Sequence, residues 1–179
     1  AASTAIRRTR FTAGSGGTIE AVLARVQALG SRYVCVTGGE PLAQPGCPEL
    51  LLRLCDAGLR VSIETSGAMS LAEVDARVVR VVDVKTPGSG EESRNRYEEL
   101  ARLEAKDQVK FVICDRADYE WSAAKVRELA LQERCGVLFS PSHAQLAAPE
   151  LAEWILADRL PVRFQIQLHK VLWGNVPGR

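Results

Sequence analysis

The sequence predicts an α/β fold built on a parallel sheet, on three observations. Short runs rich in β-branched residues alternate along the chain with segments of helical periodicity. The central runs, VVRVVDV and QVKFVI, are mostly apolar, as expected of strands covered on both faces. The sequence shows no internal repeat of roughly 33–45 residues, which argues against a solenoid. Strands that alternate with helices imply parallel βαβ units, and both a doubly wound sheet and a (β/α) barrel satisfy the pattern.

The expected elements follow one another in a regular order. The helices are 18–29, 48–57, 70–76, 94–103, 119–132 and 149–158. The strands are 32–36, 59–64, 78–84, 108–113, 136–139 and 162–168, each a β-branched run. The first helix begins after Thr18, a good N-cap, and places its apolar residues on one stripe. Pro48 suits the first turn of the second helix, and Gly58 follows its end. The last two helices are clearly amphipathic.

Composition limits the possible classes of protein. The 179 residues carry a net charge of +1, which is too balanced for a protein that coats nucleic acid or a polybasic membrane binder. No run approaches the roughly 18 apolar residues of a membrane span, and the N-terminus has no signal-peptide core. We therefore expect a cytoplasmic protein that contacts neither nucleic acid nor membrane. We expect residues 1–17 to form an irregular segment and residues 18–179 to form a single domain.

The cysteines do not form a recognisable framework. Five occur, and no Cys-x-x-Cys spacing is present, which argues against a zinc knuckle or a thioredoxin-like pair. Cys35, Cys55 and Cys114 lie in apolar surroundings and are expected to be buried in a reducing compartment. Cys47 follows Gly46 in a Pro- and Gly-containing segment and is expected to be exposed in a loop.

Polar residues gather where the predicted strands end. Ligands of parallel α/β folds bind beyond the carboxyl ends of the strands, so these clusters predict a small-molecule site on one rim. The clusters are Thr37-Gly38-Gly39-Glu40-Pro41, Glu64-Thr65-Ser66-Gly67, Asp83-Val84-Lys85-Thr86-Pro87-Gly88, Ser140-Pro141-Ser142-His143 and His169-Lys170. Each cluster alone is as well explained by a turn, a cap or a structural histidine.

The chemistry of these clusters suits an amino acid or a nucleoside. Gly38 and Gly39 let backbone groups approach a ligand closely. Glu40 and Glu64 can accept hydrogen bonds from an ammonium or a ribose hydroxyl, and Lys85 can meet a carboxylate. Neither a Gly-x-Gly-x-x-Gly nor a Walker-type motif occurs, so a dinucleotide fold and a P-loop lack support.

The sequence resembles the 7-carboxy-7-deazaguanine synthases of the radical S-adenosylmethionine (SAM) superfamily. Gly38-Gly39-Glu40-Pro41 is similar to the superfamily's motif for the SAM amino group. The other matching segments, in order, are Ile63-Glu64-Thr65-Ser66-Gly67, Val82-Asp83-Val84-Lys85-Thr86-Pro87-Gly88-Ser89, Asn95-Arg96-Tyr97-Glu98, 107–113, 138–143 and 164–174. The likeness runs from about Thr18 to Arg179, and the ordered set is far more specific than Gly-Gly-Glu-Pro alone.

The resemblance implies a fold, a reaction and cofactors. The fold would be a partial (β/α) barrel of the radical SAM type. The enzyme would be a carbon–nitrogen lyase of queuosine and deazapurine biosynthesis that converts 6-carboxy-5,6,7,8-tetrahydropterin to 7-carboxy-7-deazaguanine with loss of ammonia. It would use SAM, a [4Fe-4S] cluster and Mg²⁺, take electrons from a flavodoxin or ferredoxin, and form a homodimer.

The resemblance also implies roles for single residues. The expected SAM contacts are Gly38, Gly39, Glu40, Glu64, Asp83, Lys85 and Ser140. The expected substrate contacts are Thr37 and His169. For Asp83, a helix or turn cap is an equally good interpretation. No metal ligand and no catalytic side chain is assigned.

One departure from the family pattern concerns the cluster. The family carries Cys-x-x-x-Cys-x-x-Cys after its first strand, and this chain has that spacing nowhere. The family's first strand, its cluster loop and its magnesium-binding threonine would precede Phe11, where only Ala1–Arg10 stand. We therefore expect a chain that lacks the first βα unit and cannot hold the cluster. Such a chain would expose a sheet edge and tend to oligomerise.

Three alternatives stay open at this point. The chain could bind SAM or a pterin without catalysis, or act as a protein-interaction module. The radical SAM activases share Gly-Gly-Glu-Pro, but the Gln167-Leu168-His169-Lys170 stretch argues against that group.

Overall fold

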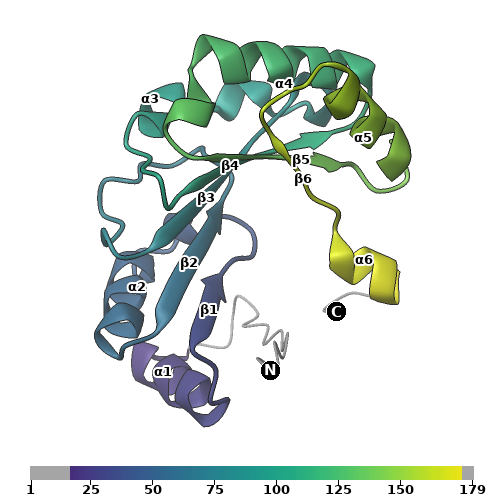
Figure 1. Ribbon diagram of the computed structural model, residues 1–179. Helices are drawn as coiled ribbons and strands as arrows, with labels where there is room; N and C mark the ends of the chain where they lie inside the picture. Colours follow the sequence, from purple (N-terminus) through teal and green to yellow (C-terminus); the bar gives the residue numbers. More distant parts are fainter. Residues whose placement is uncertain (1–16, 175–179) are drawn as a thin grey trace.

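Six parallel strands form one curved, open sheet in the computed structural model of the chain, which describes residues 17–174 apart from the side chain of His169 (Figure 1). The strands are β1 (Tyr33–Val36), β2 (Arg60–Thr65), β3 (Val79–Val84), β4 (Gln108–Ile113), β5 (Gly136–Pro141) and β6 (Arg163–Phe164). They lie in the order β1-β2-β3-β4-β5-β6, so each strand pairs with its successor, and within residues 17–174 the sheet does not close.

This order decides between the two architectures that the sequence allowed. A doubly wound sheet reverses its strand order at a switch point, with helices on both faces. Here the order is strictly sequential, and Figure 1 shows α1, α2, α4 and α5 on the outer, convex side of the sheet. The fold is therefore a partial (β/α) barrel, as the resemblance implied.

The helices agree with the sequence where local caps are strong. They are α1 (Ile19–Ala28), α2 (Cys47–Asp56), α3 (Tyr97–Leu100), α4 (Arg116–Glu128), α5 (Ala148–Ala157) and α6 (Leu168–Trp173). The Thr18 hydroxyl accepts from the backbone N–H of Ala21 and begins α1, as predicted. The Asp115 carboxylate does the same for α4 by accepting from the N–H of Asp118. This cap starts α4 three positions earlier than the predicted Tyr119.

Two predicted helices are wrong or much shorter than expected. Residues 70–76 form turns, because the Glu99 carboxylate takes the backbone N–H of Leu71 and the Asp75 carboxylate takes that of Arg77. Such side-chain acceptors compete with a helical ladder. Of the predicted helix 94–103 only the single turn α3 forms, since the Asn95 side chain is engaged with Lys85.

The last strand is also shorter than its sequence pattern predicts. Of 162–168 only Arg163–Phe164 pairs with β5, and a final backbone bond joins Gln165 N–H to the Phe139 carbonyl. The chain then turns into α6, which the sequence did not predict. No strand covers the far edge of β6 among the described residues, so its alternating pattern has no second neighbour to hold it extended.

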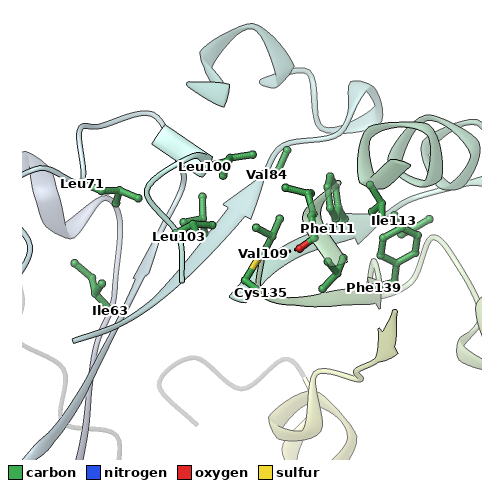
Figure 2. Packing of buried hydrophobic residues seen from close by; sticks show 14 of the residues in the cluster. Ile63, Leu71, Val84, Leu100, Leu103, Val109, Phe111, Ile113, Cys135 and Phe139 are labelled. Carbon is green, nitrogen blue, oxygen red and sulfur yellow. Dashed lines mark hydrogen bonds between the residues drawn. The ribbon is translucent and has the colours of Figure 1, made fainter. Parts of the chain in front are cut away.

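The hydrophobic core lies between the outer face of the sheet and the helices. Figure 2 shows Ile63, Val109, Phe111, Ile113 and Phe139 within this buried cluster. The ring centroids of Phe111 and Phe139 are 5.4 Å apart in an edge-on arrangement typical of packed aromatic pairs. In β2, β3 and β4 the core uses every second residue and leaves the alternate residues for the inner, concave face.

The cysteines correct two expectations. Cys47 is the first residue of α2 and is 5% exposed, so it does not lie in an exposed loop. Cys35 is exposed on β1, because its position in the strand alternates with the buried side. Cys55 is buried as expected, and Cys114 is partly buried.

Two sequence expectations fall largely beyond this description. The irregular segment 1–17 and the departure from the family before Phe11 concern residues that lie, except for Gly17, outside the described part of the chain. Between Gly17 and Gly174, no helix has both the length and the apolar character that a membrane crossing requires.

Candidate functional site

A hollow of about 110 Å³ opens on the inner face at the carboxyl ends of β1 to β4. Strand alternation explains its lining, because residues two apart in a strand share a face. Parallel register sets Glu64 beside Val81, and Asp83 beside Lys110. The complete lining is Thr37, Gly39, Glu64, Thr65, Ser66, Val81, Asp83, Lys85 and Lys110. The structure thus brings five of the nine predicted site residues together: Thr37, Gly39, Glu64, Asp83 and Lys85.

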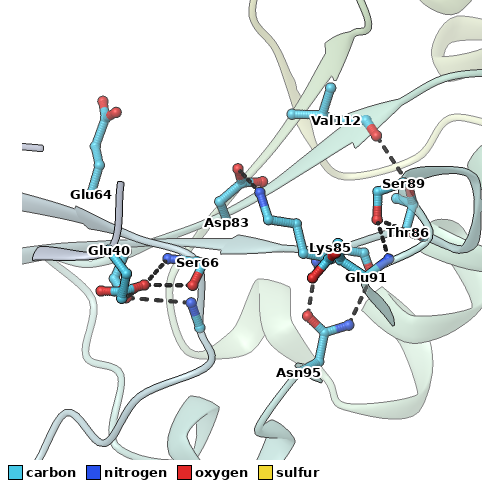
Figure 3. A network of polar contacts seen from close by, with 12 residues as sticks. Glu40, Glu64, Ser66, Asp83, Lys85, Thr86, Ser89, Glu91, Asn95 and Val112 are labelled. Carbon is cyan, nitrogen blue, oxygen red and sulfur yellow. Dashed lines mark hydrogen bonds and ion pairs between the residues drawn. The ribbon is translucent and has the colours of Figure 1, made fainter. Parts of the chain in front are cut away.

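An ion pair lies in this hollow. Lys85 Nζ stands 2.7 Å from Asp83 Oδ2, and the two side chains are 30% and 27% exposed. In Figure 3, the side chains of Asp83 and Lys85 lie on one side of β3, and Glu64 points from β2 to the same side of the sheet. The other oxygen, Asp83 Oδ1, is buried and accepts no hydrogen bond from a described residue. A buried carboxylate oxygen without a donor is costly, so it is suited to accept from a ligand N–H or O–H.

Asn95 fixes the end of β3 where Lys85 leaves the sheet. Its side-chain Oδ1 accepts from the Lys85 backbone N–H at 2.9 Å, and its Nδ2 donates to the Lys85 carbonyl at 2.8 Å (Figure 3). This amide therefore replaces a neighbouring strand at that position. The backbone N–H and carbonyl of Lys85 are thus both hydrogen-bonded, while its side chain lies in the hollow.

Asp118 anchors the loop that follows β3. Its carboxylate accepts from Thr86 Oγ1 and from the Gly88 backbone N–H, both at 2.8 Å. A Cβ at Gly88 would stand 2.5 Å from Asp118 Oδ2, so only glycine fits against this carboxylate. Asp118 is 1% exposed, and the loop beside the ion pair is thereby tied to α4.

The glycine turn after β1 has an open surface. Gly38 and Gly39 have φ angles of 110° and 58°, in the region that favours glycine. A Cβ at either position would meet no atom within 4 Å, so backbone conformation and not crowding demands glycine here. Beside the turn, Thr37 Oγ1 donates to Glu64 Oε2 at 3.2 Å. Both side chains are exposed, so they remain available to a ligand.

Glu40 is turned away from the hollow. Its carboxylate accepts from Thr65 Oγ1, from the N–H and hydroxyl of Ser66, and from the Leu42 N–H. Figure 3 shows the Glu40 carboxylate directed toward Ser66, whereas Glu64 points away from both. Burial acts to raise the pKa of Glu40, but these hydrogen bonds outweigh it and hold the pKa below its ordinary value. Glu40 thus joins the glycine turn to the end of β2, and its predicted SAM contact stays a prediction.

Two predicted residues lie apart from the lining. Ser140 is 0% exposed, and its Oγ has no hydrogen-bond partner among the residues that the structure describes. His169 belongs to α6, and its side chain is outside the described part of the structure. The roles predicted for both residues stay predictions.

One charged lining residue, Lys110, was missed from the sequence. Thr65 and Ser66 also line the hollow, and they belong to a predicted polar cluster in which neither was given a role. Asn95 supports the hollow from behind. Lys110 interrupts the apolar run QVKFVI at a position of inward parity, which is the signal that could have identified it. A polar residue in the middle of an otherwise apolar strand points to a polar inner face.

The donors and acceptors of the hollow fit SAM better than they fit an iron–sulfur cluster. The unpartnered Asp83 Oδ1, the exposed Glu64 and the Lys85 ammonium can meet the hydroxyl, amino and carboxylate groups of such a ligand. A [4Fe-4S] cluster needs convergent thiolates. In the described part of the chain, no group of three or more His, Cys, Asp or Glu residues could hold a metal ion. The described residues therefore do not fit the cluster.

Comparisons with known proteins agree with the fold and identify the family. No protein-family model matches the chain. A curated 7-carboxy-7-deazaguanine synthase of Koribacter versatilis is 40% identical over 178 residues, which covers 91% of this chain and 79% of that protein. A second, from Chlorobaculum tepidum, is 39% identical over 164 residues, which covers 90% of this chain and 74% of that protein.

Solved structures share the fold. QueE from Escherichia coli superposes with a TM-score of 0.66 at 22% identity, covering 84% of this chain and 64% of that one. SuiB of Streptococcus suis, in its structure bound to S-adenosylmethionine, gives a TM-score of 0.59 at 11% identity and covers 82% of this chain and 40% of that one. The chain thus spans less than two thirds of either solved chain. Identity near 40% over three quarters of the curated relatives, on a shared fold, shows that the chain belongs to the family of 7-carboxy-7-deazaguanine synthases.

Proposed function

We propose that this chain forms the SAM- and pterin-binding part of a 7-carboxy-7-deazaguanine synthase. The reaction is the conversion of 6-carboxy-5,6,7,8-tetrahydropterin to 7-carboxy-7-deazaguanine with loss of ammonia, which makes the enzyme a carbon–nitrogen lyase. The observation that carries the proposal is the hollow at the carboxyl ends of β1 to β4, where Thr37, Gly39, Glu64, Asp83 and Lys85 converge. It is supported by the family membership of the chain.

The residues of the hollow divide the work of binding SAM. Gly38 and Gly39 leave backbone groups open above the end of β1, where a methionine moiety can lie against them. Glu64 is positioned to accept from the ribose hydroxyls, and the buried Asp83 Oδ1 to accept a further donor. When bound and reductively cleaved, SAM supplies the 5′-deoxyadenosyl group that takes hydrogen from the substrate. Thr37 and His169 are assigned to the substrate.

The cofactors and partners beyond SAM rest on the family alone. We propose a [4Fe-4S] cluster, Mg²⁺, a flavodoxin or ferredoxin as electron donor, a homodimer and a cytoplasmic location for the working enzyme. Because the described residues do not fit a cluster, we propose that this chain binds its ligands without turnover.

Calorimetric titration of the full chain with SAM tests the proposal. Glu64→Gln and Asp83→Asn each remove a charge from the hollow, and each is expected to weaken SAM binding about tenfold, since a hydrogen bond to a charged group contributes roughly 1.5–3 kcal/mol. Glu150→Gln, on the outer helix α5, is the matched control and should bind as the native chain does. Absence of SAM binding by the native chain would overturn the proposal.

Anaerobic reconstitution with iron and sulfide separates binding from catalysis. The expected result is no [4Fe-4S] absorbance and no 7-carboxy-7-deazaguanine, with SAM binding retained. Product formation by the chain alone would show that it holds the cluster and is a complete enzyme.

A further inference from the structure

Lys110 is the lysine of the hollow for which no role has been assigned so far. It lies in the middle of β4 and lines the hollow together with Asp83 and Lys85. Register places it directly beside Asp83 of β3. Its side chain is half-buried, on the inner face that the core does not use.

Each carboxylate of the hollow already has one oxygen engaged by another group. Asp83 Oδ2 pairs with Lys85 at 2.7 Å, and Glu64 Oε2 accepts from Thr37. The side chain of Lys110 makes no hydrogen bond or ion pair with another described residue. Partial burial of an ammonium without a counterion is unfavourable, so this position gains from an anion.

The charges around the hollow also restrict where an anion could lie. Lys85 is neutralised by Asp83, whereas Glu64 would repel an incoming carboxylate. Glu64 on β2 and Lys110 on β4 are two strands apart, or about 9–10 Å across the sheet. A carboxylate at the β4 side therefore meets a cation, while the β2 side is left to hydrogen-bond donors.

We propose that Lys110 binds the carboxylate of a small molecule held in the hollow. The inference rests on the proposed function, which offers two sources of that group: the methionine carboxylate of SAM and the carboxylate of the pterin substrate and its 7-carboxy product. Lys110 is then a binding residue that orients its ligand by one charge-assisted contact.

A purely structural role for Lys110 makes a different prediction. Because Asp83 Oδ1 has no donor, Lys110 could serve only as a second cation beside Asp83. In that case its loss would disturb every ligand of the hollow alike. A carboxylate-binding role instead requires that only ligands with the carboxylate lose affinity.

Calorimetry with matched ligand pairs distinguishes these roles in the full chain. One pair is 7-carboxy-7-deazaguanine and 7-deazaguanine; the other is SAM and decarboxylated SAM. Lys110→Met is expected to weaken the carboxylated member of one pair at least tenfold and its partner less than twofold. The affected pair identifies the source of the carboxylate. Lys110→Arg should restore most of the affinity, and Lys125→Met on α4 should leave all four affinities unchanged.

The failures of the two proposals look different. If the native chain binds neither SAM nor 7-carboxy-7-deazaguanine, the proposed function fails and the inference fails with it. If the native chain binds but Lys110→Met leaves all affinities unchanged, or weakens both members of each pair equally, only the inference is overturned. A thermal melt of Lys110→Met close to that of the native chain ensures that lost binding is not lost folding.

Discussion

The Asn95 side chain holds the backbone of Lys85 by two hydrogen bonds. Its Oδ1 accepts from the Lys85 N–H at 2.9 Å, and its Nδ2 donates to the Lys85 carbonyl at 2.8 Å. In a longer parallel sheet the neighbouring strand would supply the partners of the Lys85 N–H and carbonyl, but β4 pairs with β3 only as far as Val84. A side chain thus extends the sheet by one residue at the point where the ion pair to Asp83 begins.

Replacing Asn95 with alanine is expected to loosen Lys85. The loss of two hydrogen bonds, each contributing about 0.5–1.5 kcal/mol, should lower the free energy of unfolding by roughly 1–3 kcal/mol. SAM affinity should fall several-fold, because Lys85 and Asp83 no longer keep one geometry. Urea denaturation and calorimetry measure the two effects. Asn95→Asp keeps the acceptor for the Lys85 N–H and should recover part of the loss. Native SAM affinity in Asn95→Ala would contradict this role.

A Gly38→Ala substitution should strain the turn after β1. With φ at 110° and no atom within 4 Å of the new Cβ, the cost is one of backbone conformation, about 1–2 kcal/mol. Gly46→Ala is the control, because Gly46 has a φ of −81° and its new Cβ would make an ordinary contact with Ile19. That variant should be neutral or slightly stabilising. Equal melting temperatures for the two variants would contradict the conformational explanation.

The ion pair of Arg80 and Asp107 is buried, with side chains 7% and 0% exposed and 2.7 Å between Nη2 and Oδ2. Asp107→Ala leaves the guanidinium without its partner and should cost about 3–5 kcal/mol in unfolding free energy. Asp107→Asn should cost less, since its amide oxygen can still accept from the Arg80 backbone N–H. Denaturant titration followed by circular dichroism measures both. A loss below 1 kcal/mol in Asp107→Ala would show that water replaces the carboxylate.

The lowered pKa of Glu40 predicts a dependence of stability on pH. A carboxyl group whose folded-state pKa lies below its unfolded value of 4.5 stabilises the fold fully above that pH. The contribution is lost as the pH falls through the folded-state pKa, when the carboxyl group takes up its proton. Denaturant midpoints measured from pH 7 downward should therefore fall more steeply for the native chain than for Glu40→Gln. If the midpoints of the native chain and of Glu40→Gln fell in parallel with pH, Glu40 would have the same pKa in the folded and unfolded states.

The strands could be predicted because their pattern is set by burial on one face. The first five lie within about two residues of the runs in the sequence, since every second residue enters the core. The sixth, 162–168, has the same alternation, yet only Arg163–Phe164 is paired. Periodicity records which residues suit a strand, whereas pairing depends on a neighbour that the local sequence does not contain.

The site could be predicted in part for a similar reason. Thr37, Glu64, Asp83 and Lys85 converge because the carboxyl ends of parallel strands meet on one rim. Lys110 escaped this argument, since it lies within β4 and not after it. The direction of Glu40 could not be foreseen either, because it depends on the hydroxyl groups of Thr65 and Ser66, which donate to its carboxylate.

The strictly sequential order of the strands also bears on how the chain acquires its structure. Every strand finds its partner in the next β-run along the chain, so no pairing waits for a distant segment. Such a fold can assemble one unit at a time as synthesis proceeds from the N-terminal side. On a ribosome, the hollow would be complete once β4 has emerged and paired, before α5 and α6 are made.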